Sequence, residues 1–417
     1  MADDTRFWAG NAPPSPQAIA AAMSCRLAPG DGGVLSALLP SPQVQNHAPF
    51  VAELPGGDCL CLWFAGSLEG ARDIAIHGAI LPLGSDRFGP TVAITDDPVR
   101  SEQNPLLVIG RTGGLHLINT AQPSGHQDRC ALRHRRLAVD GTAITASEAR
   151  DLPLPRGTFV RSPVHVGEDG RWLIPLFRCN PAPGEAWTGR YDTAAVGISR
   201  DEGATIEIVD VPGSVGCVHM AIVADGDHLA AFFRRRQADW IHRSESVDGG
   251  ASWSVPASTD CPNNNSSLSA IALADGRIAI ASNPTSASEH SARRASLYDE
   301  LDGDDAAAGE DEAPAAVRPR EACTPVWGIP RAPLSISVSA DGGRTFPLRR
   351  VVEDGPGTCL TNNSLDGQNH ELSYPSLVQR ADGGLDLAYT FHRRAIKFTR
   401  LPAGWIDGET RGGESDA

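Results

Sequence analysis

The side chains of this chain that can do chemistry recur at two kinds of position in a repeated pattern. One is the start of an apolar strand, and the other is the loop after the next strand. The strand starts supply Asn46 and His47, residues 102–104, Arg161, His219, residues 263–265 and residues 371–374. The loops supply Glu69, Arg72 and Asp73, residues 126–128, Arg178, Asp192, residues 234–239, Arg293, Arg294, Arg393 and Arg394. When such carboxylates, guanidinium groups, imidazoles and a phenol converge, they shift one another's pKa values, as the groups of an active site do.

Some of these carboxylates also have a structural interpretation. Asp73, Asp128, Asp192 and Asp239 each precede the third strand of a repeat. Equivalent carboxylates in successive repeats are typical of a device that stabilises a turn. For Asp128, Asp192 and Asp239 we favour that structural role.

The pattern that places these residues consists of six similar segments. Each has a proline or small polar start, an apolar strand, a glycine turn and a second apolar strand. The segments are 47–64, 104–119, 161–177, 217–233, 264–282 and 373–389. Their turn glycines are Gly57, Gly114, Gly170, Gly226, Gly276 and Gly383. A period of this size indicates a repeat architecture, and the long last step contains an acidic insertion.

A second motif, Ser-x-Asp-x-Gly-x-Ser/Thr-aromatic, interleaves with the first. It begins at Ser246 and Ser339, begins at Ser199 in a degenerate form, and is further decayed at 84–88. The Asp accepts backbone hydrogen bonds in a turn, the Gly adopts positive φ, and the aromatic residue packs between sheets. These Asp boxes are therefore expected to close the outer hairpins of the repeats and to have no catalytic role.

Two hairpins in each of six units predict an all-β fold, a six-bladed β-propeller with Asp-box hairpins. The run 34–39 is expected to supply the last strand of the sixth blade and to close the ring. We expect an N-terminal extension (1–25), one propeller (26–405) with an acidic, disordered insertion (299–320), and a flexible tail (406–417). An EF-hand spacing that would make the insertion a calcium site is missing.

Composition narrows the possible partners and compartment. The net charge of −15 argues against nucleic acid and anionic membranes as partners. Nine scattered cysteines without a CxxC pair indicate reduced core thiols, with no metal site and no cofactor expected. The N-terminus lacks the features of a signal peptide and no apolar run is long enough to span a membrane, so we expect a cytoplasmic protein.

Asp boxes on a six-bladed propeller resemble the sialidase (neuraminidase) superfamily over about residues 45–400. The segment Tyr374-Pro375-Ser376-Leu377 is similar to a sialidase element whose tyrosine is the catalytic nucleophile. The segments 47–50, 63–73, 100–105, 263–267 and 393–397 look most like a sialidase-like branch whose substrates are poorly defined. The resemblance implies a retaining exo-glycoside hydrolase that acts on a terminal, acidic sugar.

Carried over residue by residue, the resemblance implies specific roles. Tyr374 is the candidate nucleophile and Glu371 a candidate to activate it, although three residues along a strand place the two on opposite faces. Glu69 or Asp73 is the candidate acid. Residues implied to bind the sugar are His47, Arg72, Arg161, His219, Arg234, Asn264 and Arg393.

One departure from the sialidase pattern keeps alternatives open. Sialidases carry Arg-Ile-Pro on the first strand, whereas this chain has His47-Ala48-Pro49. An imidazole fits a carboxylate less well than a guanidinium fork does. The alternatives are a carbohydrate-active propeller enzyme, hydrolase or lyase, on a non-sialic glycan, and a non-catalytic glycan-binding propeller.

Overall fold

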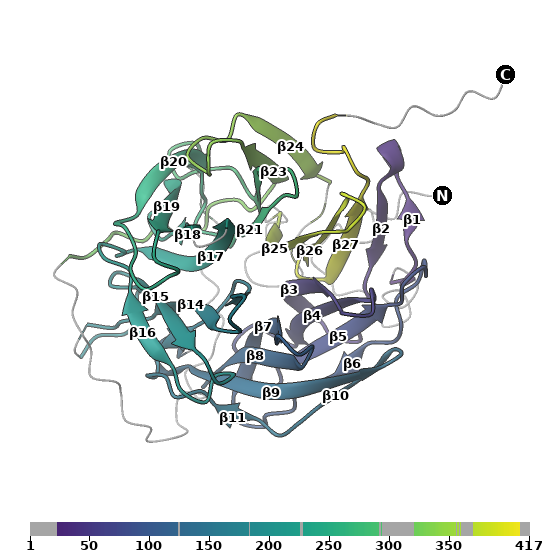
Figure 1. The fold of residues 1–417 in the computed structure, drawn as a ribbon, viewed down its shortest axis with the longest axis horizontal. Helices are drawn as coiled ribbons and strands as arrows, with labels where there is room; N and C mark the ends of the chain where they lie inside the picture. The colour runs from purple at the N-terminus through teal and green to yellow at the C-terminus, as the bar shows by residue number, and fades with distance from the viewer. Residues whose placement is uncertain are drawn as a thin grey trace.

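The computed structural model describes residues 23–123, 126–182, 184–225, 228–291, 293, 321–355, 357, 359 and 370–408. The expected insertion at 299–320, the turn at Gly226, residues 1–22 and residues 409–417 lie outside these ranges. Six antiparallel sheets of four or five strands stand around one central axis, as Figure 1 shows. The predicted six-bladed β-propeller is therefore confirmed.

The first three blades follow one another along the chain, and each begins at the centre of the ring. Blade 1 comprises β3 (Gln45–Glu53), β4 (Cys59–Gly66), β5 (Ala75–Leu81) and β6 (Val92–Ala93). Blade 2 comprises β7 (Ser101–Ile109), β8 (Leu115–Gln122), β9 (Ala131–Asp140), β10 (Ala143–Ala146) and β11 (Arg150–Asp151). Blade 3 comprises β12 (Thr158–Phe159), β13 (His165–Val166), β14 (Trp172–Arg178), β15 (Thr193–Ser199) and β16 (Glu207–Asp210).

The last three blades complete the ring, and the chain's two ends meet in the sixth. Blade 4 comprises β17 (Cys217–Asp225), β18 (His228–Arg235), β19 (Trp240–Ser246) and β20 (Ala257–Pro262). Blade 5 comprises β21 (Ser269–Ala272), β22 (Ile278–Ser282), β23 (Leu334–Ser339) and β24 (Leu348–Glu353). Blade 6 comprises β25 (Leu372–Gln379), β26 (Leu385–Phe391), β27 (Ala395–Leu401), β2 (Leu35–Leu38) and β1 (Ala28–Pro29).

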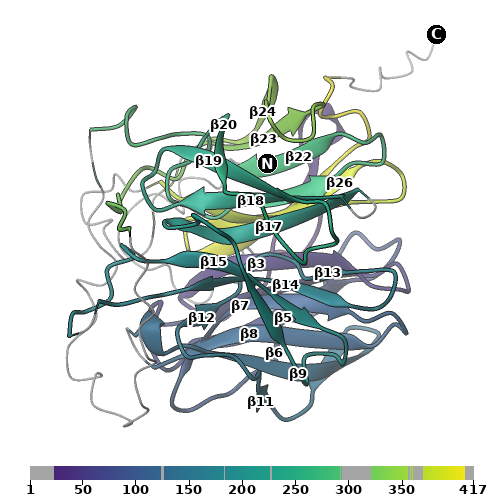
Figure 2. The same ribbon diagram turned by 60° about the vertical axis from the view of Figure 1, so that its left-hand side comes forward.

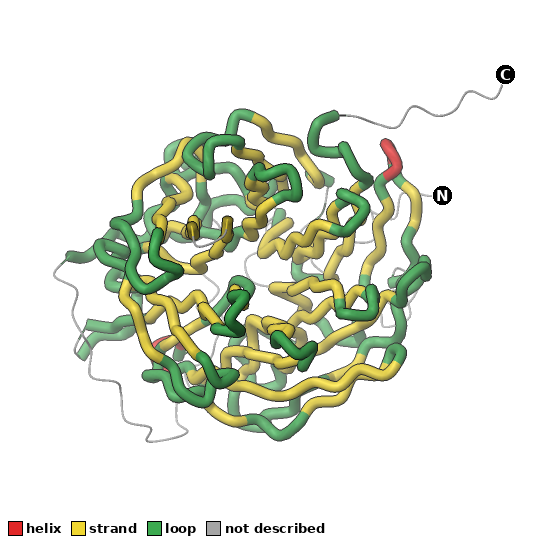
Figure 3. The backbone as a smooth tube through the Cα atoms, in the orientation of Figure 1, coloured by secondary structure: helices red, strands yellow, loops and turns green. Residues whose placement is uncertain are grey.

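The ring is closed by the N-terminal strand β2. Leu35 pairs with Arg400 and Leu38 with Lys397, so β2 lies antiparallel to β27 at the C-terminal end of the fold (Figure 1). This confirms the closure predicted from residues 34–39. The tube in Figure 3 shows strands and loops almost throughout, with short 3-10 turns at Asp31–Gly33 and Gln127–Arg129.

The hydrophobic core lies in the seams between neighbouring blades. Asp-box aromatics contribute to these seams, because Trp253 of blade 4 packs beside Leu173 of blade 3 and Phe346 of blade 5 lies 6.1 Å from Phe232 of blade 4. Gly343 adopts a φ of 83°, and a Cβ there would come within 2.2 Å of Phe232. The box glycine therefore allows both the turn and the close approach of two blades. Figure 2 shows the stacked edges of several blades.

The Asp boxes occupy the outer hairpins, as predicted. They connect β15 to β16, β19 to β20 and β23 to β24. In the second box Ser246 donates to Asp248, Gly250 N donates to Ser246 Oγ at 2.8 Å, and Ser252 N donates to Asp248 at 2.9 Å. In this box the serine, aspartate and backbone groups bind one another within eight residues of chain, while the buried Trp253 Nε1 has no partner among the described residues.

Candidate active site

The innermost strands of the blades share a local distortion at the centre of the ring. Their register shifts between His47 and Phe50, between Gln103 and Leu106, between Val218 and Ala221, and between Ser373 and Ser376. Within these bulges, non-glycine residues adopt positive φ of 50–55°, at Ala48, Asn104, His219 and Tyr374, and Asn265, shortly before β21 (Ser269–Ala272), does so too. Such conformations cost roughly 1–3 kcal/mol each and cluster at functional sites. The bulge resets the alternation of the strand.

Tyr374 stands at one of these bulges, among side chains from other blades. Its hydroxyl accepts a hydrogen bond from Arg234 Nη1 at 2.9 Å. The guanidinium carbons of Arg161 and Arg331 lie 5.4 Å and 5.3 Å from the centre of its ring. His47 stacks obliquely on the ring, with centroids 4.3 Å apart. The fold therefore brings Tyr374, Arg161, Arg234 and His47 together from blades 6, 3, 4 and 1.

Glu371 joins two arginines beside Tyr374. Its Oε1 accepts from Arg331 Nη1 and from Ser373 Oγ, both at 2.7 Å, and its Oε2 accepts from Arg393 Nε at 3.0 Å. Arg393 also donates to Glu69 Oε2 and lies 3.4 Å from His47 Nε2. Glu371 and Arg393 are buried, while the Glu69 side chain is 15% exposed. One network thus holds both candidate carboxylates, Glu69 and Glu371.

Two buried arginines of the cluster have polar partners that include no carboxylate. Arg161 donates to the backbone carbonyls of Pro49, Tyr374 and Pro375. Arg234 contacts Asn265 Oδ1 at 2.7 Å as well as Tyr374. Burial lowers the pKa of each guanidinium to about 10, so both remain charged at neutral pH. The cluster therefore carries positive charge that no described carboxylate offsets.

Several buried polar atoms around Tyr374 lack a hydrogen-bond partner among the described residues. They are Arg161 Nε, His219 Nδ1 and Arg331 Nε. Buried polar groups are normally satisfied, and an exception needs an explanation such as an unseen partner. Together with the surplus positive charge, these atoms indicate a site suited to a polar, anionic ligand.

The two histidines of the cluster are neutral. Burial lowers the pKa of His47 well below its ordinary value, and the charge of Arg393 lowers it further. Burial and Arg234 do the same for the pKa of His219. His47 Nδ1 lies 2.8 Å from Thr390 Oγ1, so with Arg393 donating to Nε2 the Nδ1 nitrogen carries the proton. His47 thereby binds Arg393.

The structure separates some predicted residues from this cluster. Asp73 is exposed and binds Ser67, whose backbone N donates to it at 2.9 Å. Arg72 is also exposed, in the same turn before β5. Asn264 is buried and donates to the carbonyl of Pro330 at 2.7 Å. Asp192 is buried in an ion pair with Arg236 at 2.6 Å, the structural role that we favoured.

Sequence reasoning missed Arg331. It follows the acidic insertion, and the hydrogen bond from Asn283 to its carbonyl fixes it beside blade 5. Its position after the insertion, in the connection between the second and third strands of that blade, was the available signal. Two tryptophans were also missed. Trp187 and Trp327 flank Arg236, whose guanidinium carbon lies 5.4 Å and 4.9 Å from their rings.

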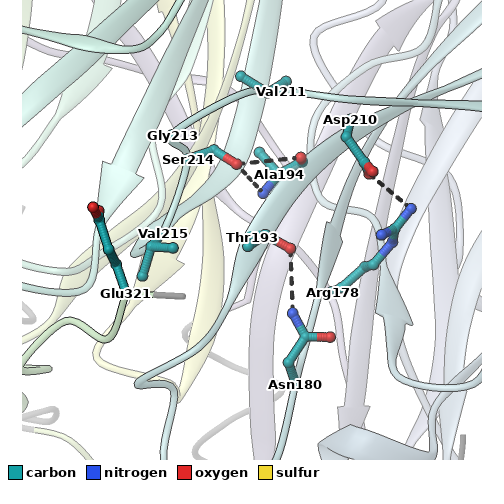
Figure 4. A pocket seen from close by; sticks show the side chains of 10 residues that line it. All are labelled: Arg178, Asn180, Thr193, Ala194, Asp210, Val211, Gly213, Ser214, Val215 and Glu321. Carbon is teal, nitrogen blue, oxygen red and sulfur yellow. Dashed lines mark hydrogen bonds and ion pairs between the residues drawn. The ribbon is translucent and has the colours of Figure 1, made fainter. Parts of the chain in front are cut away.

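A separate cavity of about 340 Å³ lies beside blade 3 and the loop that leads from it to blade 4, as Figure 4 shows. Most of its polar side chains bind one another. Arg178 pairs with Asp210 at 2.9 Å, Asn180 donates to Thr193 Oγ1 at 3.2 Å, and Ala194 N donates to Ser214 Oγ at 3.0 Å (Figure 4). Because these groups are already paired, we place the candidate active site at Tyr374.

The described residues were also compared with the requirements of metal sites, disulfides and membrane-spanning helices. Within the described ranges, no group of three His, Cys, Asp or Glu side chains is arranged to hold a metal ion. All nine cysteines are free thiols, and eight of them are buried. No helix in the part of the chain that the structure describes is long and apolar enough to cross a membrane.

Comparison with known proteins identifies the family to which the chain belongs. The family model described as "BNR repeat-like domain" matches residues 57–387, which is most of the chain. The chain belongs to the BNR repeat-like domain family. This membership agrees with the Asp boxes and with the sialidase-like superfamily expected from them. No curated protein matches the chain.

Solved structures share the fold of this BNR repeat-like protein at low sequence identity. A Hadza microbial sialidase matches with a TM-score of 0.62 and 12% identity, over 86% of this chain and 66% of that one. Trypanosoma rangeli sialidase with the inhibitor DANA matches with a TM-score of 0.58 and 13% identity, over 90% and 57%. A Dyadobacter fermentans protein of unknown function matches with 0.61 and 13%, over 88% and 98%. At these identities the likeness establishes the fold, and the chain spans only about two thirds or less of the two sialidases.

Proposed function

We propose that this propeller is a retaining exo-glycoside hydrolase that removes a terminal acidic sugar, with Tyr374 as the nucleophile. One observation carries the proposal. The Tyr374 hydroxyl is bonded to Arg234 within a group of buried arginines whose charge is not offset by described carboxylates. An anionic sugar would supply the missing negative charge and partners for the unsatisfied donors. The shared fold of two sialidases supports the same class of reaction.

The geometry suggests a role for each group. Arg161, Arg234 and Arg331 would bind the anionic substituent of the sugar and hold its anomeric carbon against Tyr374. Glu69 is the candidate acid because its carboxyl group is partly exposed beside the cluster, whereas Glu371 is fully buried. Glu371 and His47 would position Arg331 and Arg393, respectively. Asp73, bound to Ser67 in an exposed turn, is the weaker acid candidate.

A second candidate function is β-elimination from a uronate by the same centre. It is favoured by one observation, namely that both nearby carboxylates, Glu69 and Glu371, are bound to Arg393. In a lyase, arginines neutralise the uronate carboxylate and a tyrosine or histidine removes the adjacent proton, so no free carboxylic acid is required. The two candidates differ in product, because only elimination creates an unsaturated uronate, which absorbs ultraviolet light.

Turnover of a panel of aryl and natural glycosides, including sialosides and uronides, tests the proposal. We expect wild-type protein to release the sugar from an acidic glycoside, and Tyr374→Phe to lose activity by a factor on the order of 10³ or more. Tyr191→Phe, which removes a tyrosine hydroxyl outside the cluster, is the matched control. Unchanged activity in Tyr374→Phe would refute the nucleophile. An unsaturated product would select the lyase, and binding without turnover would indicate a glycan-binding propeller.

A further inference from the structure

The hydroxyl of Tyr374 is surrounded by more positive than negative charge. Arg234 touches its oxygen, while Arg161 and Arg331 lie over its ring. Arg393 adds a fourth guanidinium group, which Glu69 and Glu371 offset. The imidazoles of His47 and His219 beside the ring are neutral. Arg236, whose charge also acts on Tyr374, is paired with Asp192. A phenolate oxygen would accept the Arg234 hydrogen bond more strongly than a neutral hydroxyl does.

The carboxylate expected to activate Tyr374 is committed elsewhere. Glu371 accepts hydrogen bonds from Arg331, Ser373 and Arg393 through its two oxygens. The Cys359 Sγ atom lies 3.6 Å from Oε2 as well, so Glu371 is surrounded by donors other than the phenol, whose proton a general base would have to accept. Either another group removes the proton of the Tyr374 hydroxyl, or no general base is needed.

We infer that Arg234 stabilises the phenolate form of Tyr374 in the substrate-free protein, so that the nucleophile is activated by an arginine. Arg234 is then a catalytic residue that contacts the reacting oxygen. The inference deepens the proposed function and depends on it for its catalytic meaning. The phenolate itself is a property of the free protein and can be measured without substrate.

In the proposed reaction, each proton and each bond that breaks can be followed through two steps. Tyr374 releases its proton to solvent before the substrate arrives. The phenolate oxygen then bonds to the anomeric carbon while the bond from that carbon to the leaving oxygen breaks, and the leaving oxygen takes the proton of the acid, for which Glu69 is the candidate. Water later attacks the same carbon, returns a proton to the acid and releases the phenolate. The arginines screen the phenolate from an anionic substituent on the sugar.

The direction of the Tyr374 pKa agrees with this geometry. Burial raises the pKa of the phenol, but Arg234 and Arg331 lower it, and the net shift is downward. Ionisation of Tyr374 should therefore occur at lower pH than that of an ordinary tyrosine. The lowering should become smaller when the Arg234 charge is removed.

Ultraviolet difference absorbance of tyrosinate during a pH titration tests the inference. The chain has only four tyrosines, so one early step can be resolved. We expect wild-type protein to show one tyrosine ionising below the others, Tyr374→Phe to lack that step, and Arg234→Gln to move it upward by about one pH unit or more. The inference is overturned if the early step persists in Tyr374→Phe or stays in place in Arg234→Gln.

Two variants keep the test decisive. Arg243→Gln removes the same charge from β19 of the same blade, where Arg243 pairs with Glu245, and should leave the early step unchanged. Arg234→Lys keeps the charge and is milder toward folding. It should raise the step by less than Arg234→Gln, and the absence of any rise would count against the inference. Loss of glycoside turnover with an intact early step would instead refute the proposed function alone.

Discussion

The Asp-box turns at the rim and the Tyr374 cluster at the centre are both dense in polar side chains, but they are built in opposite ways. In the box at 246–253, hydroxyl and carboxylate groups bind backbone N–H groups a few residues away. Around Tyr374, the partners come from different blades, and several buried polar atoms have no described partner. A stable turn satisfies itself, whereas a binding site retains polar groups for a ligand.

Backbone strain separates the two regions as well. The boxes place glycine where φ is positive, as at Gly250 and Gly343. The central bulges place asparagine, histidine and tyrosine in that conformation, at Asn104, His219 and Tyr374. Glycine adopts it without steric cost, while the other residues must be held there by their surroundings. Strain carried by chemically active side chains is a further reason to assign function to the centre.

The largest predicted effect breaks the central network at Glu371. Glu371→Gln leaves the buried guanidinium groups of Arg331 and Arg393 with one less negative charge. We expect a loss of about 3–5 kcal/mol of stability, because removing one partner of a buried ion pair leaves an uncompensated charge. Turnover should fall as well, since Arg331 and Arg393 lose their orientation. Chemical denaturation and glycoside assays measure the two effects.

The matched control for that variant is Glu207→Gln, on the exposed surface of β16. It removes the same charge without breaking a described ion pair. If both variants unfold at the same denaturant concentration, the buried ion pairs of Glu371 do not contribute to the stability of the protein as we describe.

A smaller effect is expected from the box aromatic Trp253. It is 6% exposed and fills the seam between blades 3 and 4. Trp253→Ala should lower the free energy of unfolding by about 3 kcal/mol, because removal of the indole leaves a cavity in that seam. The kcat/KM of the folded protein should stay within about twofold of wild type, since the box is remote from the chemistry. A large fall in kcat/KM with normal stability would show that the rim takes part in function.

The smallest effect concerns the box carboxylate Asp248. Hydrogen bonds from Ser252 and Ser246 lower its pKa to about 2, below the ordinary 3.8. Its stabilising contribution is therefore complete above the ordinary value and is lost as pH falls toward the lowered one. Asp248→Ala should lower the midpoint of thermal unfolding by a few degrees at neutral pH, without changing activity.

The pH dependence provides the check on that assignment. The difference in unfolding midpoint between wild type and Asp248→Ala should shrink as pH falls through the lowered pKa. Thermal unfolding followed over acidic pH measures it. A difference that stays constant across this range would mean that the carboxylate charge does not stabilise the turn.

The repeat pattern allowed the architecture to be predicted because its determinants are local. The Ser-x-Asp-x-Gly turn makes its hydrogen bonds within eight residues, and the alternation of apolar strands with glycine turns fixes four strands per unit. The prediction that 34–39 closes the ring also succeeded, because an apolar strand left over at one end has to pair with an open blade edge.

The candidate site was only partly predictable. Strand starts and following loops correctly pointed to Tyr374, Arg161, Arg234 and His47 as neighbours. The expectation that Glu371 and Tyr374 lie on opposite faces assumed an unbroken strand, but Glu371 precedes β25 and the strand is bulged at Tyr374. Arg331 was missed because its place beside Tyr374 depends on how the chain returns from the insertion to blade 5.

The sequence by itself determined the six blades, the Asp-box turns and part of the set of residues that meet at the centre, because these follow from local turns and a fixed period. The tertiary structure decided which charges pair. Arg393 is bound by Glu69, Glu371 and His47, whereas the described partners of Arg161 and Arg234 include no carboxylate. Ion pairing depends on ångström-scale distances between blades that are far apart in sequence, and no local pattern encodes those distances.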